Sequence, residues 1–187
     1  ELKDHEFSSD KLEIIDCSEV INMEDHATKA FKSKSNSSIS KGFEYLAKDK
    51  IDGFASAGNT GAMFVGGFYA VKTIPGILRP PLAALLPRED GGVKVLLDVG
   101  ANADCKPDVL YQFGVLGSLF SEHVCGIRTP KVNLLNLGEE KTKGNLLTQA
   151  TYILMENNPD YTFIGNCEGR DIFNSESDVI VCDGFTG

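Results

Sequence analysis

The sequence predicts an α/β fold with a mainly parallel sheet, and three of its features support that prediction. Short apolar runs rich in β-branched residues alternate with longer stretches of helical periodicity. Two such runs, residues 82–86 and 93–98, are separated by a short glycine-containing turn, which predicts one antiparallel hairpin. Loops rich in glycine and asparagine follow directly after apolar runs, as is common at the carboxyl ends of strands.

The first part of the chain is predicted to combine strands with helices. Apolar, β-branched residues such as those of LEIIDC predict strands, and apolar residues at helical spacing predict helices on either side of a polar, basic stretch. In chain order, these elements are expected at residues 12–17 (strand), 23–31 (helix), 38–48 (helix), 53–56 (strand) and 61–72 (helix).

The stretch from residue 53 to residue 71 contains no charged residue, which is also typical of a membrane span. It also contains five glycines together with Asn59 and Thr60. That composition favours a buried strand, a loop and a helix over a membrane span.

The second part of the chain repeats strands and helices in a regular order. Pro75, Pro80 and Pro81 break the chain before the hairpin. Pro107 occupies a favourable first-turn position for a long helix, and Gly126 follows its end. Strands are expected at residues 82–86, 93–98, 132–136, 162–164 and 179–182, and helices at 107–124 and 145–157.

Composition restricts the class of protein. With 42% hydrophobic and 24% charged residues, the chain resembles a soluble globular protein. A net charge of −9 repels nucleic acid, so nucleic acid is not an expected partner. Five cysteines, an odd number without a C-x-x-C pair, favour a reducing compartment over a disulfide framework or a zinc knuckle.

Residues 1–187 are expected to form a single α/β region that is a fragment of a longer chain lacking both termini. The chain opens within a charged stretch that has no apolar signal segment. Its last residues, 183–187, form a loop directly after an apolar strand run. In an α/β protein such a loop leads into a further element.

The loops after the apolar runs predict an anion site at one edge of the sheet. Parallel strands end at the same edge, where ligands of open α/β sheets bind. Backbone N–H groups of glycine-rich loops and of helix N-termini suit phosphate. Turn formation alone explains any one of these loops, whereas five of them on one edge favour a site. The residues expected to bind substrate or phosphate are Ser56, Gly58, Asn59, Thr60, Gly61, Asp98, Gly100, Asn102, Asn145 and Asn166.

Other kinds of site are disfavoured. The loops contain no P-loop string and no dinucleotide-binding G-x-G-x-x-G. They also contain none of the histidines, His5, His26 and His123, which disfavours Ser-His or Cys-His catalysis. Cys105 lies near a helix start, but without a neighbouring base a structural role is favoured. The loop carboxylates follow no metal-ligand spacing, so neither a metal nor another cofactor is expected.

Lys143 is the candidate catalytic cation. It lies in a glycine-flanked loop immediately before the helix expected at residues 145–157. A cation at that place would meet phosphate or a developing oxyanion. A solvated lysine beside Lys141 and Glu140 explains its position equally well.

Six longer strings are more specific than any of these patterns. They are SAGNTGA (56–62), IPGILRPPLAALLP (74–87), LLDVGANADCKP (96–107), LLNLGEEKTKGN (134–145), GNCEGRD (165–171) and CDGFTG (182–187). In the same order, from about residue 20 onward, they resemble the PlsX family of phosphate acyltransferases. The resemblance implies a three-layer αβα architecture like that of the isocitrate and isopropylmalate dehydrogenases, as a homodimer.

The resemblance also implies a reaction. Acyl carrier protein thioester and inorganic phosphate give acyl phosphate, which feeds phospholipid synthesis. The lysine of the family's K-G-N motif falls on Lys143, which implies a catalytic role for it. An important asparagine of the family would directly follow Gly187, and the family's N-terminal strand with its Gly-Gly-Asp loop is also missing.

The residues suit that reaction. Near neutral pH, phosphate is substantially a dianion and attacks a thioester without a histidine base. The site then has to hold two anionic species and stabilise a tetrahedral oxyanion. Asn59, Thr60, Asn102 and Asn166 are candidates to position phosphate or the thioester carbonyl.

The implied partners are acyl carrier protein and inorganic phosphate. The family further implies a cytoplasmic enzyme with peripheral membrane association beside the downstream glycerol-phosphate acyltransferase. Since both carrier and chain are acidic, docking requires a local basic patch. The candidates are Lys29, Lys32, Lys34 and Lys41, although a mobile, solvated surface loop explains these lysines equally well.

Three alternatives remain at this point. A phosphate acetyl- or butyryltransferase would perform the same chemistry with a coenzyme A thioester. A non-catalytic phosphate- or carrier-binding module would keep the fold without the reaction. A dehydrogenase of the related fold is the weakest, because the chain shows neither a nicotinamide fingerprint nor a convincing metal cluster.

Overall fold

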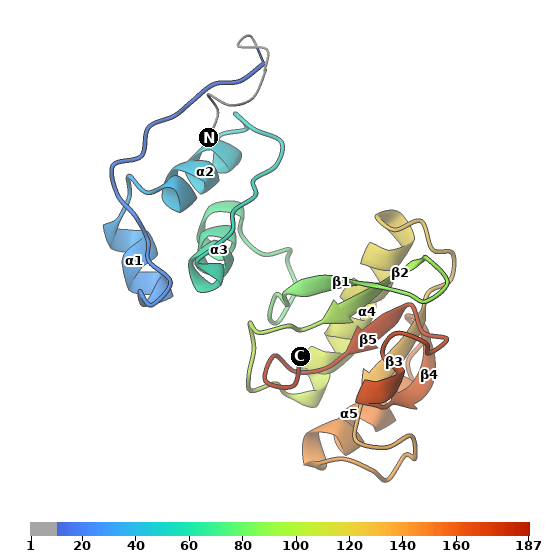
Figure 1. The fold of residues 1–187 in the computed structure, drawn as a ribbon. Helices are drawn as coiled ribbons and strands as arrows, with labels where there is room; N and C mark the ends of the chain where they lie inside the picture. The colour runs from blue at the N-terminus through green and yellow to red at the C-terminus, as the bar shows by residue number, and fades with distance from the viewer. Residues whose placement is uncertain (1–10) are drawn as a thin grey trace. The chain divides into compact units, whose positions relative to one another are not determined.

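The computed structural model describes residues 11–187, and the chain divides into two compact units. Unit 1 extends to Lys72, and unit 2 comprises Thr73–Gly187. In Figure 1, the helices α1 to α3 belong to unit 1, and the sheet with α4 and α5 belongs to unit 2. The expectation of one α/β region within a longer chain stays a prediction.

The described part of unit 1 is helical. It contains α1 (Ala27–Ser33), α2 (Ser38–Ala47), α3 (Thr60–Gly66) and the π-helix η2 (Gly67–Val71), which continues α3. Ser37 caps α2, since its side chain accepts a hydrogen bond from the backbone N–H of Ser40. The core gathers around Phe43, whose ring meets Phe31 and Phe54 edge to face, with centroids 6.2 and 5.2 Å away.

The strands predicted at residues 12–17 and 53–56 are wrong. Neither segment is a strand, and between residues 11 and 72 the only β-pairing is an isolated bridge between Glu19 and Ser37. Residues 12–17 also lack a buried face, since Ile14 is 74% exposed. A strand needs a hydrogen-bonded neighbour, and local sequence cannot supply one.

The uncharged stretch 53–71 forms a loop followed by α3 and η2, so its helix is confirmed. Among the helices of residues 11–187, none combines the length and the apolar character needed to cross a membrane.

Unit 2 confirms the α/β prediction. Its strands are β1 (Ala83–Pro87), β2 (Val93–Leu97), β3 (Lys131–Leu135), β4 (Thr162–Cys167) and β5 (Val179–Val181). They form one sheet in the order β1-β2-β5-β3-β4. β1 and β2 pair antiparallel, which confirms the hairpin, whereas β2, β5, β3 and β4 run parallel.

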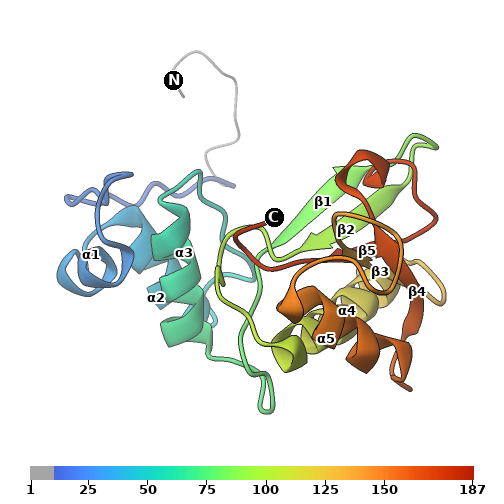
Figure 2. The same cartoon turned by 90° about the horizontal axis from the view of Figure 1, so that it is seen from below.

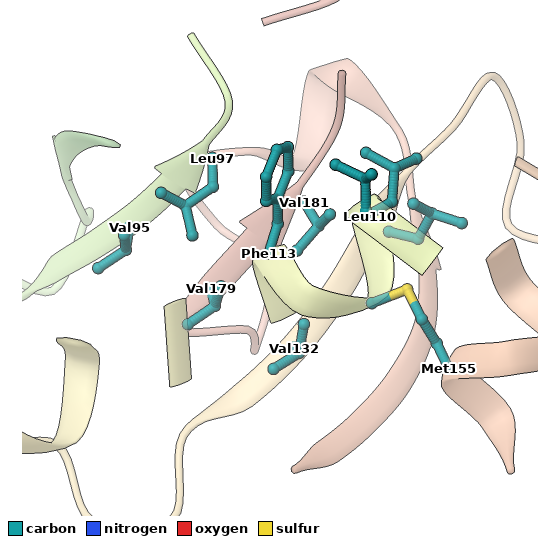
Figure 3. Close-up of a cluster of buried hydrophobic side chains, with 10 residues drawn as sticks. Val95, Leu97, Leu110, Phe113, Val132, Met155, Val179 and Val181 are labelled. Carbon is teal, nitrogen blue, oxygen red and sulfur yellow. The ribbon is translucent and has the colours of Figure 1, made fainter. Parts of the chain in front are cut away.

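Two helices cover one face of this sheet. α4 (Pro107–His123) begins at a proline, as predicted, and α5 (Leu146–Glu156) is capped by Asn145. Figure 2 shows the two helices side by side below the strands. Figure 3 shows the core between them and the sheet, where Phe113 lies among valines of the central strands and Met155 joins from α5.

The opposite face of the sheet carries a smaller cluster. Leu96, Ile180, Cys167 and Cys182 are buried there, with Ile172 packed against them from the segment that bears the short 3-10 helix η3 (Gly169–Asp171). A buried lysine, Lys94, lies on the same strand as Leu96 and donates hydrogen bonds to the carbonyl and the hydroxyl of Ser175, at 3.0 and 2.6 Å. Burial lowers the pKa of Lys94.

Truncating the Phe113 side chain of α4 tests this packing. Phe113 is fully buried, so Phe113→Ala removes apolar contacts and leaves a cavity. We expect the free energy of unfolding to fall by about 3–5 kcal/mol. The matched control is Leu119→Ala on the same helix, where the side chain is 48% exposed and the expected change is below about 1 kcal/mol. Denaturant titration of both variants measures the difference, and equal losses would contradict the assignment of the core.

Candidate functional site

The carboxyl edge of the unit 2 sheet brings four of the predicted loops together. Because β2, β5, β3 and β4 run parallel and lie next to one another in that order, their carboxyl ends share one edge. The segments that begin there follow Leu97, Val181, Leu135 and Cys167. Four predicted site segments, 98–102, 138–145, 165–171 and 183–187, therefore meet at this edge.

Asp98 organises the first of these loops. Its fully buried carboxylate accepts hydrogen bonds from the backbone N–H of Leu82 (2.9 Å), of Ala101 (3.1 Å) and of Asn102 (2.8 Å). The side-chain amide of Asn102 donates a fourth bond to it, at 2.8 Å, and also bonds the carbonyl of Pro80 at 2.9 Å. A buried carboxylate is stable only when its oxygens are satisfied in this way.

These contacts limit what the loop can offer a ligand. The side chains of Asp98 and Asn102 are engaged with the chain itself. Gly100, by contrast, has φ +130° and open space where a Cβ would lie. The backbone N–H groups of Val99, Ala101 and Asn102 also donate within the chain. Direct binding of phosphate by Asp98, Gly100 and Asn102 stays a prediction.

The loop after β5 packs against this structure. Gly184 N–H donates to the carbonyl of Asn102 at 2.9 Å, and a Cβ on Gly184 would lie 2.8 Å from the Asn102 nitrogen and 3.1 Å from an Asp98 oxygen. Only glycine permits this approach. Asp183 orders the rest of the segment by accepting bonds from Phe185 N–H and Thr186 N–H. Sequence reasoning did not single out Gly184, although a glycine directly after a strand-end aspartate is a usable signal.

Lys143 lies in the loop between β3 and α5. Its side chain is exposed, and its Nζ makes no ion pair or hydrogen bond with residues 11–187. The neighbouring cations are engaged. Lys141 pairs with Glu156 and lies 5.6 Å from the Tyr152 ring centroid, and the Glu156 hydrogen bond raises the pKa of Lys141.

Arg170, at the start of the segment after β4, pairs with Glu168 and Asp171. Lys143 is thus an unpaired ammonium group on a loop at the edge where the anion site was predicted. An unpaired cation at such a place can meet a phosphate or an oxyanion.

The side chains of Asn145 and Asn166 form hydrogen bonds with main-chain groups. Asn145 caps α5, because its side-chain oxygen accepts from Thr148 N–H at 2.9 Å. Asn166 is buried, and its amide donates to the carbonyl of Glu140 at 3.0 Å. Two amides that sequence reasoning missed, Asn136 and Gln149, also donate to this loop. Direct binding of substrate by Asn145 and Asn166 stays a prediction.

The remaining predicted loop, Ser56 to Gly61, belongs to unit 1. Asn59 is buried and caps α3 by accepting from Ala62 N–H at 3.0 Å, while its amide donates to the carbonyls of Asn22 and Met23, both at 3.0 Å. Gly58 has φ +142°, and its carbonyl accepts from the Ser56 hydroxyl at 3.2 Å. Thr60 and Gly61 are exposed at the start of α3. A ligand-binding role for these residues stays a prediction.

The predicted carrier-docking lysines also lie in unit 1, and two of them are paired. Lys34 bonds Asp25 at 2.6 Å, and Lys41 bonds Glu44 at 3.1 Å. Lys32 lies 5.0 Å from the Tyr69 ring centroid, beside a cavity of about 420 Å³ lined by aromatic side chains of unit 1. Lys29 is exposed on α1. The pairing of Lys34 and Lys41 reduces the charge available for docking.

Three thiols, the partly buried Cys105 and the buried Cys167 and Cys182, are unsuited to nucleophilic catalysis. Burial raises the pKa of Cys105 to about 11 and those of Cys167 and Cys182 to about 12, so each is a neutral thiol near pH 7. Within residues 11–187, no three His, Cys, Asp or Glu side chains gather as metal ligands would. His123 lies in the last turn of α4, and His5 lies outside the described residues.

Comparison with known proteins gives consistent matches over the whole chain. A family model described as fatty acid synthesis protein matches residues 1–187. The chain is 47% identical over 186 residues to a protein named phosphate acyltransferase from Dictyoglomus thermophilum, covering 100% of this chain and 55% of that protein. Proteins with the same name from Halothermothrix orenii and Staphylococcus aureus are 46% and 42% identical, over 100% and 99% of this chain and 56% of each relative. The chain spans about half the length of these curated relatives.

Solved structures share the fold. A phosphotransacetylase from Streptococcus pyogenes superimposes with a TM-score of 0.59 at 19% identity, over 78% of this chain and 50% of that chain. The EutD phosphotransacetylase from Staphylococcus aureus gives a TM-score of 0.57 at 18% identity, over 78% and 51%. At this level of identity, the likeness concerns the fold alone.

Removing the Asp98 carboxylate tests the organisation of the site. Asp98→Ala leaves three backbone N–H groups and the Asn102 amide without their acceptor, so we expect a loss of about 3 kcal/mol or more in the free energy of unfolding. The control is Asp104→Ala, which removes an exposed carboxylate from the same stretch and is expected to cost less than about 0.5 kcal/mol. Denaturant unfolding compares them. Similar losses in both variants would show that Asp98 does not anchor the loops.

Proposed function

Because the chain belongs to the fatty acid synthesis protein family, in which its relatives are named phosphate acyltransferase, we propose that the full-length protein is an acyl carrier protein:phosphate acyltransferase. It moves a fatty acyl group from the carrier thioester to inorganic phosphate and so supplies acyl phosphate for phospholipid synthesis. The observation that carries this proposal is the match over all 187 residues, at 41–47% identity to phosphate acyltransferases.

The geometry of the sheet edge supports such a reaction. Inorganic phosphate is itself the nucleophile: a phosphate oxygen forms a bond to the thioester carbonyl carbon, and the carbonyl oxygen becomes an oxyanion. When the tetrahedral intermediate collapses, the carbon–sulfur bond breaks and the carrier thiolate leaves, and through solvent it takes up the proton that the phosphate group gives up. No histidine base is required, in keeping with the position of His123 in α4, away from the loops.

In this mechanism the Lys143 ammonium group is the catalytic cation. Its charge offsets that of the phosphate and of the developing oxyanion, and its unpaired state leaves it free to do so. The neutral donor proposed at the same edge is the backbone N–H of the exposed Gly100, because those of Val99 and Ala101 donate within the chain. The two anionic reactants are thereby held without a metal ion.

The proposal also covers the binding partners and the cellular location. We propose acyl carrier protein as the acyl donor, docking through the basic side chains of Lys29 and Lys32, which form no ion pair with residues 11–187. The full-length protein is proposed to act as a cytoplasmic homodimer that associates peripherally with the membrane near the glycerol-phosphate acyltransferase that consumes its product. The carrier, the homodimer and the location follow from the family resemblance, and the docking lysines follow from the acidity of both partners.

The choice of donor tests the reaction. Full-length protein is incubated with inorganic phosphate and either acyl carrier protein thioester or acyl-coenzyme A, and hydroxylamine traps the acyl phosphate as a hydroxamate. We expect product mainly from the carrier thioester. Equal turnover of acyl-coenzyme A would favour a coenzyme A-dependent phosphate acyltransferase, and no product from either donor would favour a non-catalytic binding module.

A pair of lysine substitutions tests the catalytic cation. Lys143→Ala should lower kcat about 100-fold or more, as the loss of one oxyanion-stabilising group does, with an unchanged Tm because the side chain is exposed. Lys141→Ala is the matched control, because it removes a lysine of the same loop whose ammonium group is bound to Glu156. Near-normal turnover by Lys143→Ala would remove this residue from the mechanism.

A further inference from the structure

Three side-chain amides bind the main chain of the loop that carries Lys143. We propose that Asn136, Gln149 and Asn166 are positioning residues, which hold this loop and thereby fix where the Lys143 ammonium group stands. The inference rests on the catalytic role proposed for Lys143. For Asn166 it proposes a positioning role, whereas the sequence predicted substrate binding.

The amides come from three separate elements. Asn136 follows β3, and its Nδ2 donates to the carbonyl of Lys143 itself at 3.2 Å. Gln149 lies in the first turns of α5, and its Nε2 donates to the carbonyls on either side of Lys143, those of Thr142 at 2.9 Å and Gly144 at 3.1 Å.

Asn166 anchors the beginning of the same loop from β4. Its Nδ2 donates to the carbonyl of Glu140 at 3.0 Å and lies 3.4 Å from that of Glu139. Within the loop, Lys143 N–H in turn donates to the carbonyl of Glu140 at 3.0 Å. The carbonyl that Asn166 binds is therefore the one that accepts from Lys143.

Close packing adds to these hydrogen bonds. Gly144 has φ +92°, and a Cβ there would collide with the Thr148 hydroxyl and with the Asn136 side chain. Gly144 thus packs closely against the Asn136 side chain, which also binds the carbonyl of Lys143, and only glycine permits this close contact. Both flanks of Lys143 are fixed, and the first part of its exposed side chain lies close to Gly138 of the same loop.

The burial of Asn166 favours the positioning role. Its side chain is 8% exposed, and both contacts of its amide nitrogen are with loop carbonyls. Its Oδ1 is buried and has no hydrogen-bond partner among residues 11–187. The amide N–H groups of Asn166 are thus used on the loop, and its proposed contribution to an anion site is the placement of that loop.

The convergence of these contacts argues for positioning rather than for general stability. A solvated lysine needs no support, yet the carbonyls of Thr142, Lys143 and Gly144 each accept from a side-chain amide. Each bond restrains main chain that belongs to no helix or strand. Fixing the main chain that carries Lys143 reduces the number of positions that its ammonium group can occupy. Catalysis that depends on orientation requires such a restriction.

The first measurement asks whether the amides hold the loop. Gln149→Met removes the donor and keeps a long helix-forming side chain. In full-length protein, we expect amide hydrogen exchange in residues 138–145 to accelerate about tenfold or more, with little change in the strands. The matched control is Asn157→Leu, which removes an amide-to-carbonyl bond, to Ile153 at 2.9 Å, at the other end of α5. Unchanged exchange in Gln149→Met would overturn the proposal.

The second measurement asks whether the effect passes through Lys143. We expect Gln149→Met to lower kcat for acyl phosphate formation by about 10- to 100-fold. In a Lys143→Ala background, the same substitution should change kcat by less than about twofold, because there is no ammonium group left to misplace. An equal loss in both backgrounds would show a merely structural role and refute positioning. Asn166→Leu provides a second pair for the same comparison.

The two measurements separate the failure of this inference from that of the proposed function. Normal turnover by Lys143→Ala alone would refute the catalytic role of Lys143, and with it the positioning of a catalytic group. Hydrogen exchange does not depend on turnover, so it still reports whether the amides restrain the loop. If Lys143→Ala reduces turnover but Gln149→Met leaves hydrogen exchange unchanged, the proposed function is supported. The positioning role of the three amides is then refuted.

Discussion

The sheet of unit 2 is a single sheet because β5 pairs on both sides. Val179 lies opposite Val95 of β2 and opposite Val132 of β3, and all three residues of β5 are fully buried. Without β5, the strands would separate into β1–β2 and β3–β4. Since β5 runs parallel to both neighbours, it also brings the carboxyl ends of β2 and β3 to one edge, and the loops of the candidate site meet there.

Buried polar side chains give that edge its shape. Asp98 is satisfied by four donors, and the buried amides of Asn102 and Asn166 donate to the carbonyls of Pro80 and Glu140. Each group would carry a desolvation cost if it were unpaired, so the pairing restricts the loops to one arrangement. The side chain of Lys143, in the loop between β3 and α5, makes no ion pair with residues 11–187 and is the cation proposed to meet an anion there.

Fold and family support different conclusions about this protein. The likeness to phosphotransacetylases, at 18–19% identity, shows the architecture, and the same architecture can support different reactions. The match to the fatty acid synthesis family and the identity to phosphate acyltransferases are what favour an acyl carrier protein thioester as donor. The site geometry is compatible with either donor, because in both reactions phosphate attacks a thioester.

The sequence by itself determined the elements that depend on local signals. The glycine turn predicted the hairpin of β1 and β2, Pro107 marked the start of α4, and Asn145 preceded α5. Tertiary structure decided the rest. Residues 12–17 have a strand-like pattern but no strand partner, and the hydrogen bond from the Asn166 amide to the loop that carries Lys143 was not visible in the sequence. The physical reason is that strand pairing and side-chain hydrogen bonds join residues far apart in the chain, which local periodicity does not encode.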